Sequence, residues 1–175
     1  MMKIILAVFA ASSLLLYSTP SFAISLSVGV PIGASIKSDD GSEMADGASG
    51  YFLGVQLPFG LGLGMDSHKT KFKDDSTLKV ATSMYNLYYQ LPVPVVRLIL
   101  GLGTGNSNYD CPGCAEIFDK GAATQWYTSI GFPIIPFFDI HLSYRSITSK
   151  NIKAPDGTKY DVSGTITGIG LAFNF

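Results

Sequence analysis

Three residues that could together perform nucleophilic chemistry lie close in the sequence: Asp139, His141 and Ser143. A carboxylate, an imidazole and a hydroxyl are the components of a catalytic triad, in which the base must reach the nucleophile through a hydrogen bond. Their spacing of two residues is that of a strand, where neighbouring members share one face and stand about 6.6 Å apart at the backbone. Triad members normally come from different elements. The spacing therefore argues against a triad, and we predict no catalytic residue.

Other polar side chains are expected on the same face of the strands as these three residues. In the strand-like segments of the chain, apolar residues alternate with small or polar ones. The ionisable residues well inside these segments fall on the side of the small residues, which we expect to line the interior of a barrel narrow enough to be filled by side chains. The residues predicted to form a polar plug in that lumen are Gln56, Gln90, Arg97, Asp139, His141 and Arg145.

Within this plug, we expect Arg97 and Asp139 to pair across the intervening strand, with His141 joining them. A buried charge that loses its partner is strongly destabilising, so a paired arrangement is favoured. Ionisable groups inside a membrane-spanning segment are also candidates for function. A path for protons or small solutes is therefore the alternative to a structural plug.

The two cysteines of the chain form a Cys111-Pro112-Gly113-Cys114 motif. A redox-active CxxC motif requires a βαβ context with its first cysteine at a helix start, and the surrounding residues do not predict one. Two cysteines alone also provide too few ligands for a structural zinc site. We therefore predict a local disulfide between Cys111 and Cys114 in an exported loop, and no metal or other cofactor.

The first 23 residues have the pattern of a cleaved signal peptide. Lys3 precedes an apolar run from Ile4 to Tyr17, and small residues precede a cleavage site after Ala23. The apolar run is shorter than the about 20 residues that a membrane-spanning helix requires. We predict removal of residues 1–23 on export, with residues 24–175 forming a single domain.

The composition narrows the class of protein. Charged residues are 14% of the chain, compared with about 25% in typical soluble domains. No apolar run after residue 23 approaches the about 18 residues expected of a transmembrane helix, and a formal net charge of −1 gives no support to nucleic-acid binding. An exported chain of this kind is either a membrane β-barrel or a secreted β-sandwich or lipocalin-like barrel.

Eight strand-like segments can be identified from the alternation of apolar and small or polar residues. They lie at 24–34, 50–59, 61–66, 79–91, 95–104, 123–132, 138–145 and 160–175. Long polar loops at 35–49, 67–78, 105–122 and 146–159 alternate with short turns that contain proline, as in outer-membrane barrels. This division places Asp66 at the inward-facing end of the third strand and assigns His68 to the second loop.

The last segment has the clearest difference between its two faces. Ile169, Leu171, Phe173 and Phe175 fall on one face, small residues predominate on the other, and no charge occurs from Val162 onward. Such a strand suits lipid on one side and a narrow interior on the other, whereas a soluble lipocalin-like barrel has its apolar face inside. We therefore predict an all-β, eight-stranded antiparallel up-and-down transmembrane β-barrel.

A cleaved signal, eight alternating strands and a terminal phenylalanine resemble the small outer-membrane barrels of Gram-negative bacteria, of the OmpX, OmpW and OmpA-domain kind. The resemblance is one of architecture and covers residues 24–175. It implies location in the outer membrane and insertion by the barrel-assembly machinery, for which Phe173 and Phe175 would form the recognition signal. His141-x-Ser143 also resembles the His-x-Ser motif of barrel lipid A deacylases, although Tyr144 stands where that motif has asparagine.

The loop charges indicate how the outer end could interact. The first and third loops are mainly acidic, and the second and fourth are mainly basic. Neighbouring loops could attract one another, the lysines could meet lipopolysaccharide phosphates, or the loops could simply be solvated. We predict a non-enzymatic protein with a structural or surface-interaction role, whose partners are outer-membrane lipids and lipopolysaccharide. A narrow small-solute channel and a lipid A-modifying enzyme are the alternatives.

Overall fold

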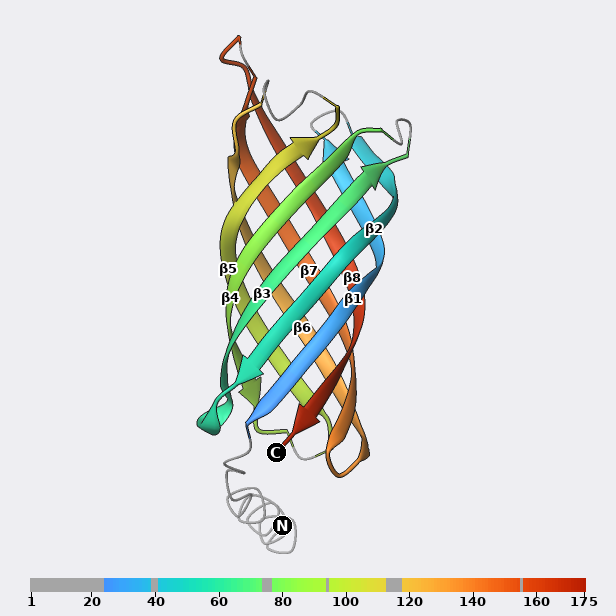
Figure 1. Ribbon diagram of the computed structural model, residues 1–175, viewed down its shortest axis with the longest axis vertical. Coiled ribbons are helices and arrows are strands. Elements are labelled where there is room, and N and C mark those ends of the chain that lie inside the picture. The colour runs from blue at the N-terminus through green and yellow to red at the C-terminus, as the bar shows by residue number, and fades with distance from the viewer. Residues whose placement is uncertain (1–23, 39–40, 74–76, 94, 113–117, 155) are drawn as a thin grey trace, which may run out of the picture.

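The computed structural model describes residues 24–38, 41–73, 77–93, 95–112, 118–154 and 156–175, so the predicted signal peptide lies outside the described residues. The chain forms eight antiparallel strands that pair in chain order and close into a barrel (Figure 1). The 3-10 turn η1 (Pro58–Gly60) joins the second strand to the third. The predicted fold class is confirmed. The strands are β1 (Ser25–Ser38), β2 (Gly41–Gln56), β3 (Leu61–Phe72), β4 (Lys79–Leu91), β5 (Arg97–Asp110), β6 (Gly121–Ile135), β7 (Phe138–Lys153) and β8 (Lys159–Asn174).

Side chains alternate between the two surfaces of the barrel wall, as the sequence predicted. On β4, Tyr85, Leu87 and Tyr89 are exposed on the outer surface, whereas Met84 and Tyr88 are buried in the lumen. Because successive side chains of a strand point to opposite faces, closing the sheet sends one set outward and the other inward. The outer surface is consequently apolar, and the inner surface carries small, polar and aromatic residues.

The strands extend further toward the long-loop end than the sequence predicted. β1 continues to Ser38, which pairs with Gly41 at the start of β2, so most of the predicted loop 35–49 is strand. The predicted boundaries of the other three long loops are wrong in the same direction, because β3, β5, β6, β7 and β8 all extend into them. Those boundaries followed the end of the apolar outer face. Hydrogen bonds between strands need no lipid and continue beyond that point.

A register shift in β1 changes which side chains enter the lumen. The shift lies between Pro31 and Gly33 opposite β8, and beyond it Ile36 is buried inside the barrel. A bulge of this kind adds a residue and reverses the parity that continuous alternation would give. The buried residues that meet at the long-loop end are Ile36, Val80, Ile152 and Val162, which we call the apolar cap.

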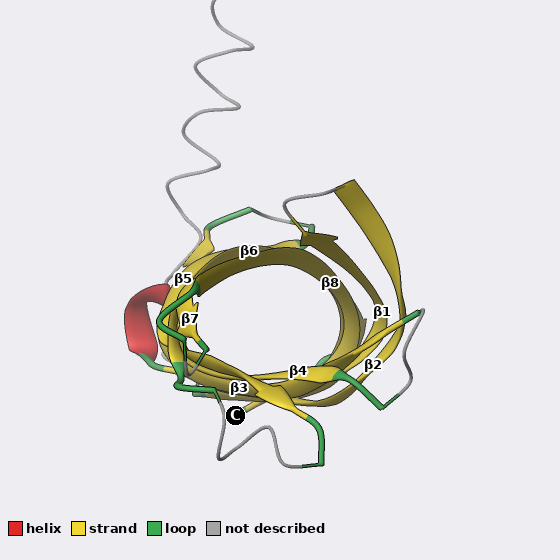
Figure 2. Ribbon diagram, turned by 90° about the horizontal axis from the view of Figure 1, so that it is seen from above, coloured by secondary structure: helices red, strands yellow, loops and turns green. Residues whose placement is uncertain are grey.

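The first and last residues of the barrel, Ile24 and Phe175, lie at the end that carries the short turns. There the Phe175 N–H donates to the carbonyl oxygen of Ile24 at 2.9 Å. Seen along its long axis, the barrel is a closed ring of strands (Figure 2). Among the described residues, no helix combines the length and the apolar character needed to cross a membrane.

Two tyrosines fill the middle of the lumen because glycines stand opposite them. Tyr88 pairs across the sheet with Gly62 and also with Gly101, and Gly101 pairs in turn with Tyr127. A methyl group added at Gly62 would overlap the Tyr88 ring, and one added at Gly101 would overlap the Tyr127 ring. The two rings meet edge to face with their centroids 6.4 Å apart. The narrow barrel therefore accommodates these two rings because glycines on the neighbouring strands leave room for them.

Replacing Gly101 with alanine should lower the free energy of unfolding by about 1–3 kcal/mol, the usual cost of overpacking a core. The added methyl group has no room beside the Tyr127 ring. Urea unfolding of the refolded protein in lipid vesicles, followed by tryptophan fluorescence, measures the loss. The double variant Gly101→Ala/Tyr127→Leu removes the overlap, so its cost should be less than the sum of the single costs. Additive costs would contradict the overlap.

Candidate functional site

The lumen near the turn end contains an ion pair joined by an amide. Arg97 on β5 places Nε 2.8 Å from Oδ2 of Asp139 on β7. Asn174 on β8 donates from Nδ2 to the same Asp139 oxygen at 2.8 Å, and its Oδ1 accepts from Nη1 of Arg97 at 2.5 Å. Asp139 is 1% exposed and Arg97 27% exposed, so the carboxylate is buried while the guanidinium reaches the mouth of the barrel. The sequence prediction did not include Asn174, although its inward parity could have indicated it.

His141 lies next to this pair but is not bound to it. Its Nε2 is 3.9 Å from Asp139 Oδ2, which is beyond hydrogen-bond distance. Its Nδ1 is 3.3 Å from Ser129 Oγ on β6. Ser143 instead accepts a hydrogen bond from Nη1 of Arg145 at 2.5 Å. The three residues considered for a triad therefore have different partners inside the barrel.

The two glutamines of the predicted plug line the same end of the lumen. Gln56 is buried at the end of β2, and Gln90 is partly buried near the end of β4. The Oε1 atom of Gln90 has no hydrogen-bond partner among the described residues. The two amides therefore belong to the polar lining, and the ion pair of Arg97 and Asp139 is held by Asn174 instead.

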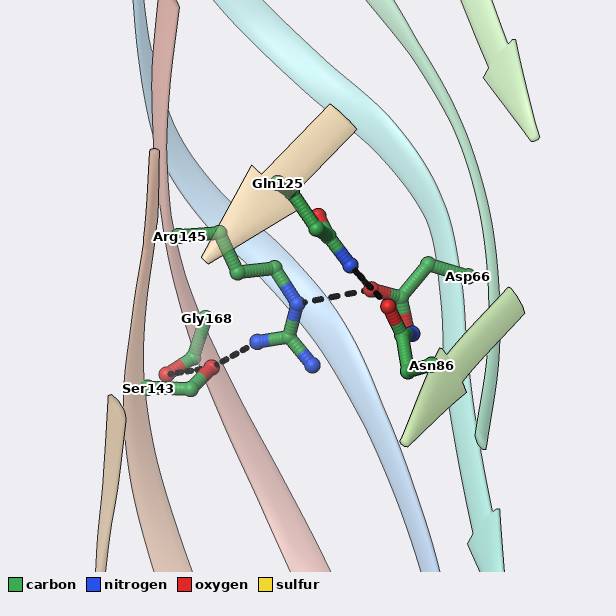
Figure 3. A network of polar contacts seen from close by, with 6 residues as sticks. All are labelled: Asp66, Asn86, Gln125, Ser143, Arg145 and Gly168. Carbon is green, nitrogen blue, oxygen red and sulfur yellow. Dashed lines mark hydrogen bonds and ion pairs between the residues drawn. The ribbon is translucent and has the colours of Figure 1, made fainter. Parts of the chain in front are cut away.

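A second ionic network lies further along the lumen, and the sequence prediction included only one of its charged members (Figure 3). Arg145 on β7 donates from Nε to Oδ2 of Asp66 on β3 at 3.0 Å. Gln125 on β6 donates from Nε2 to the same Asp66 oxygen at 2.7 Å and also contacts Oδ1 of Asn86 on β4. The side chains of Asp66 and Arg145 are 1% and 7% exposed. The buried carboxylate thus joins β3, β6 and β7, and Gln125 links the fourth strand, β4, through Asn86.

Arg145 is also held between two aromatic rings. Its Cζ lies 3.7 Å from the ring centroid of Phe52 and 4.8 Å from that of Tyr127. A guanidinium stacked on aromatic faces gains a cation–π attraction, which is larger when water is excluded. The ion pair and the rings together compensate the cost of removing this charge from water.

The sequence interpretation was incomplete for two inward-facing ionisable residues, Asp66 and His68. Asp66 was placed on the inward face but was not predicted to join the plug, and His68 was assigned to a loop. The structure places both on β3 and buries both in the lumen, with His68 at 6.2 Å from Phe52, measured between ring centroids. The strand continues past Asp66 because β3 pairs with β4 as far as Lys71 and Lys79.

The remaining length of the lumen is filled by hydroxyl groups and then by apolar groups. Ser107 Oγ lies 2.8 Å from both Thr82 Oγ1 and Ser149 Oγ, which joins β4, β5 and β7. The apolar cap follows at the long-loop end. A cavity of about 60 Å³ lies beside Arg145 and His141, and one of about 30 Å³ lies between the hydroxyl groups and the apolar cap. One water requires roughly 10–15 Å³ of cavity volume, so these two cavities accommodate a few waters and nothing larger.

The predicted disulfide can be placed only in part, and the sequence predicts no metal site. In the part of the chain that the structure describes, no group of three His, Cys, Asp or Glu side chains could hold a metal ion. Cys111 follows β5, whereas Cys114 lies outside the described residues, so the disulfide stays a prediction. Phe173 and Phe175 lie on the outer surface at the turn end, where the Phe173 and Phe138 rings stack edge to face at 4.3 Å.

No family model and no curated protein sequence matches the chain. Solved structures match over most of its length. Neisserial surface protein A (NspA) has a TM-score of 0.68 at 16% identity, over 89% of this chain and 98% of NspA. Outer membrane protein AlkL, determined in DMPC lipid bilayers, has a TM-score of 0.56 at 10% identity, over 90% and 92% of the two chains. Outer Membrane Protein W of E. coli has a TM-score of 0.52 at 10% identity, over 85% and 97%. The fold is therefore that of the small eight-stranded outer-membrane β-barrels.

The two ion pairs predict different costs for removing a carboxylate. Asp66→Ala should lower the free energy of unfolding by about 3–5 kcal/mol, because it leaves the buried Arg145 charge without a counter-ion. Asp139→Ala should cost less, since Arg97 is partly exposed and can be solvated. Urea unfolding in vesicles of the same lipid measures both variants.

The double variant Asp66→Leu/Arg145→Met serves as the control for this comparison. It removes both charges and fills their space with apolar side chains, so it should be less destabilising than Asp66→Ala alone. An Asp139→Ala variant that costs as much as Asp66→Ala, or a double variant that is worse than the single one, would contradict the assignment of the buried charges.

Proposed function

We propose that residues 24–175 span the outer membrane of a Gram-negative bacterium as a closed, non-conducting barrel that acts structurally or through its long-loop end. Residues 1–23 would direct its export and be removed. The observation that carries the proposal is the combination of an apolar outer wall with a lumen filled by paired charges and an apolar cap. An outer wall of this kind would be poorly soluble in water and is stable against hydrocarbon.

The outer wall supports a membrane location. Exposed leucine, isoleucine, valine and aromatic side chains occur on every strand. Among the described residues, the charged side chains at the same height, such as Asp66 and Arg145, are buried in the lumen. An arginine or lysine facing lipid near the membrane midplane would cost about 2–4 kcal/mol, which explains this distribution. AlkL, which has the same fold, is described as an outer membrane protein in lipid bilayers.

The filled lumen supports a barrel that does not conduct. An eight-stranded barrel is only wide enough for its own side chains. Here the ion pairs of Arg97 and Arg145 lie across the lumen at two heights, and the apolar cap follows above them. A hydrated ion would have to break both charged networks and pass an apolar constriction. We therefore favour the plug over the narrow channel.

The outer rim supports an interaction with anionic lipid headgroups. Lys71 and Lys79 stand directly opposite each other on β3 and β4, above the apolar wall, and like charges in such a pair repel. Lys69 Nζ lies 2.7 Å from Asp110 Oδ2, and this hydrogen bond lowers the pKa of the Asp110 carboxyl. Lys69, Lys71 and Lys79 thus gather on one side of the rim, and Asp110 is paired with Lys69. Phosphate groups of lipopolysaccharide would compensate the remaining charge.

The exposed aromatic residues at the turn end support an assembly signal. Phe173 and Phe175 both face outward at the end of β8, and Phe173 stacks on Phe138 of the neighbouring strand. An insertion factor that binds the last strand before the barrel closes would contact these rings, because they lie on the outward face of that strand. We propose the barrel-assembly machinery as the partner during insertion.

Planar-bilayer recordings test the plug directly. The purified barrel should give no discrete conductance steps, because both ionic networks and the apolar cap block the lumen. Heat-modifiable migration on a gel should accompany insertion and shows that the sample is folded. Regular conductance steps from folded protein would favour the channel and contradict the plug.

The enzyme alternative has a separate test. His141 is buried in the lumen between Ser129 and Asp139, beside a cavity of about 60 Å³ that holds a few waters, which supports a non-enzymatic protein. Incubation with lipid A followed by mass spectrometry should leave the lipid unchanged for both the original chain and His141→Ala. Loss of an acyl chain that depends on His141 would establish the lipid A-modifying activity instead.

A further inference from the structure

The end of the barrel that carries the short turns is unusually apolar. Its three connections, 57–61, 91–96 and 132–138, contain no ionisable residue and are made of proline, glycine and large apolar side chains. Val95 is 79% exposed and Phe137 68% exposed, and Ile134, near the end of β6, is also exposed. The turns lie at the end of the barrel where the C-terminus is marked (Figure 1). A turn that projects into water normally contains polar turn-forming residues such as Asn, Asp or Ser. These turns therefore resemble the outer wall in chemistry.

The apolar part of the strands is too short to fill a membrane without the turns. The outward apolar residues run from Ile24 to Ile32 on β1 and from Val96 to Leu102 on and just before β5. At about 3.4 Å per residue and a tilt of about 40°, these runs rise about 16–21 Å along the barrel axis. The apolar band of an outer-membrane barrel is about 25 Å tall. Several ångströms of hydrocarbon thickness remain to be covered.

The long-loop end is less suited than the turns to supply the missing height. Above the apolar residues of β3, the outward positions are Ser67, Lys69 and Lys71. On β5 the next outward positions after Leu102 are Thr104 and polar residues that follow it. A lysine on the lipid face costs up to about 1 kcal/mol near the interface and about 2–4 kcal/mol at the midplane, whereas an apolar turn carries no such cost. The apolar surface instead continues without a break into the turns at the opposite end.

The mouth of the lumen at the turn end is also compatible with a position close to lipid. The partly exposed charge there is Arg97, and Asp139 and Asn174 occupy its guanidinium at 2.8 and 2.5 Å. The pair carries no net charge. The mouth can therefore lie at the level of lipid headgroups without presenting an uncompensated ion to hydrocarbon.

We infer that the three turns are an immersed lipid-binding surface, which penetrates the boundary between headgroups and acyl chains of the phospholipid leaflet on the turn side. This inference rests on the proposed membrane function and adds the position of the barrel in the bilayer. The occupant of the surface is phospholipid, because the apolar turns continue the lipid-facing wall and supply the height that it lacks. A protein partner or a second copy of the chain would leave that height unfilled.

Tryptophan quenching by brominated phospholipids tests this position. Trp126, the single tryptophan, lies on the outer wall and reports insertion of the original chain. The variant Trp126→Phe/Phe137→Trp moves the probe to a turn, and Trp126→Phe/Val95→Trp places it on another turn in case the first variant does not fold. Trp126→Phe/Lys120→Trp puts the probe at the exposed long-loop end as the aqueous control. Each is reconstituted in phosphatidylcholine vesicles with acyl chains brominated near the ester, with iodide on both sides in a parallel sample.

The turn probes should be quenched by the brominated lipid to an extent similar to Trp126 and should resist iodide, whereas the Lys120 position should show the opposite. Turn probes that iodide quenches and brominated lipid does not would overturn the inference, since the turns would then be in water. Protection from both quenchers would also overturn it and indicate contact between copies of the chain. If Trp126 itself escapes the brominated lipid, the proposed membrane function fails, which separates the two results.

Discussion

The closed ring of backbone hydrogen bonds is the constraint on which the other features of this protein depend. Each strand pairs on both sides, and β1 pairs with β8 to remove the edges. Unpaired backbone groups are very costly in hydrocarbon, so a closed barrel is one of the few structures that can face lipid. Closure also gives every residue an inner or an outer position. The outer position must suit lipid, and the inner position must suit a space only one or two side chains wide.

The narrow lumen explains how charged residues are tolerated in so apolar a chain. Asp66 meets Arg145 and Gln125, whereas Asp139 meets Arg97 and Asn174, so each carboxylate binds one cation and one amide. The contact of Asn174 with Asp139 joins the neighbouring strands β8 and β7, and the other three connect strands that are not neighbours in the sheet. They act across the lumen, perpendicular to the hydrogen bonds of the wall, and they stabilise the cross-section of the barrel. The plug and the wall are therefore parts of one structure.

Much of this architecture follows from the period of two in the sequence. Alternation is visible without coordinates, and it assigns Arg97 and Asp139 to the same interior. Pairing between distant strands is harder to predict, because the partner of Arg145 depends on the stagger that closes the barrel. A shift of two residues would preserve every inward assignment and still bring a residue other than Asp66 to Arg145.

Local irregularities limited the sequence prediction in other places. The bulge in β1 turns Ile36 inward, and the sequence has no simple signal for it beyond Pro31 and Gly33. His68 was assigned to a loop because the apolar outer face ends before it, although strand pairing continues. Asn174 carries an inward amide like Gln56 and Gln90, but its contact with Asp139 depends on the register between β7 and β8. Hydrophobic alternation thus locates the lipid boundary, whereas strand length and register depend on backbone pairing.

The central claim is that the apolar wall faces hydrocarbon while the charged side faces a filled interior. Spin labels placed one at a time at Tyr85, Leu87 and Tyr89 on β4, in reconstituted vesicles, measure this most directly. The account predicts that each label collides frequently with oxygen dissolved in lipid and rarely with a water-soluble nickel complex, and that a label at Lys79 shows the reverse preference. Labels at all three wall positions that collide mainly with the nickel complex would contradict it.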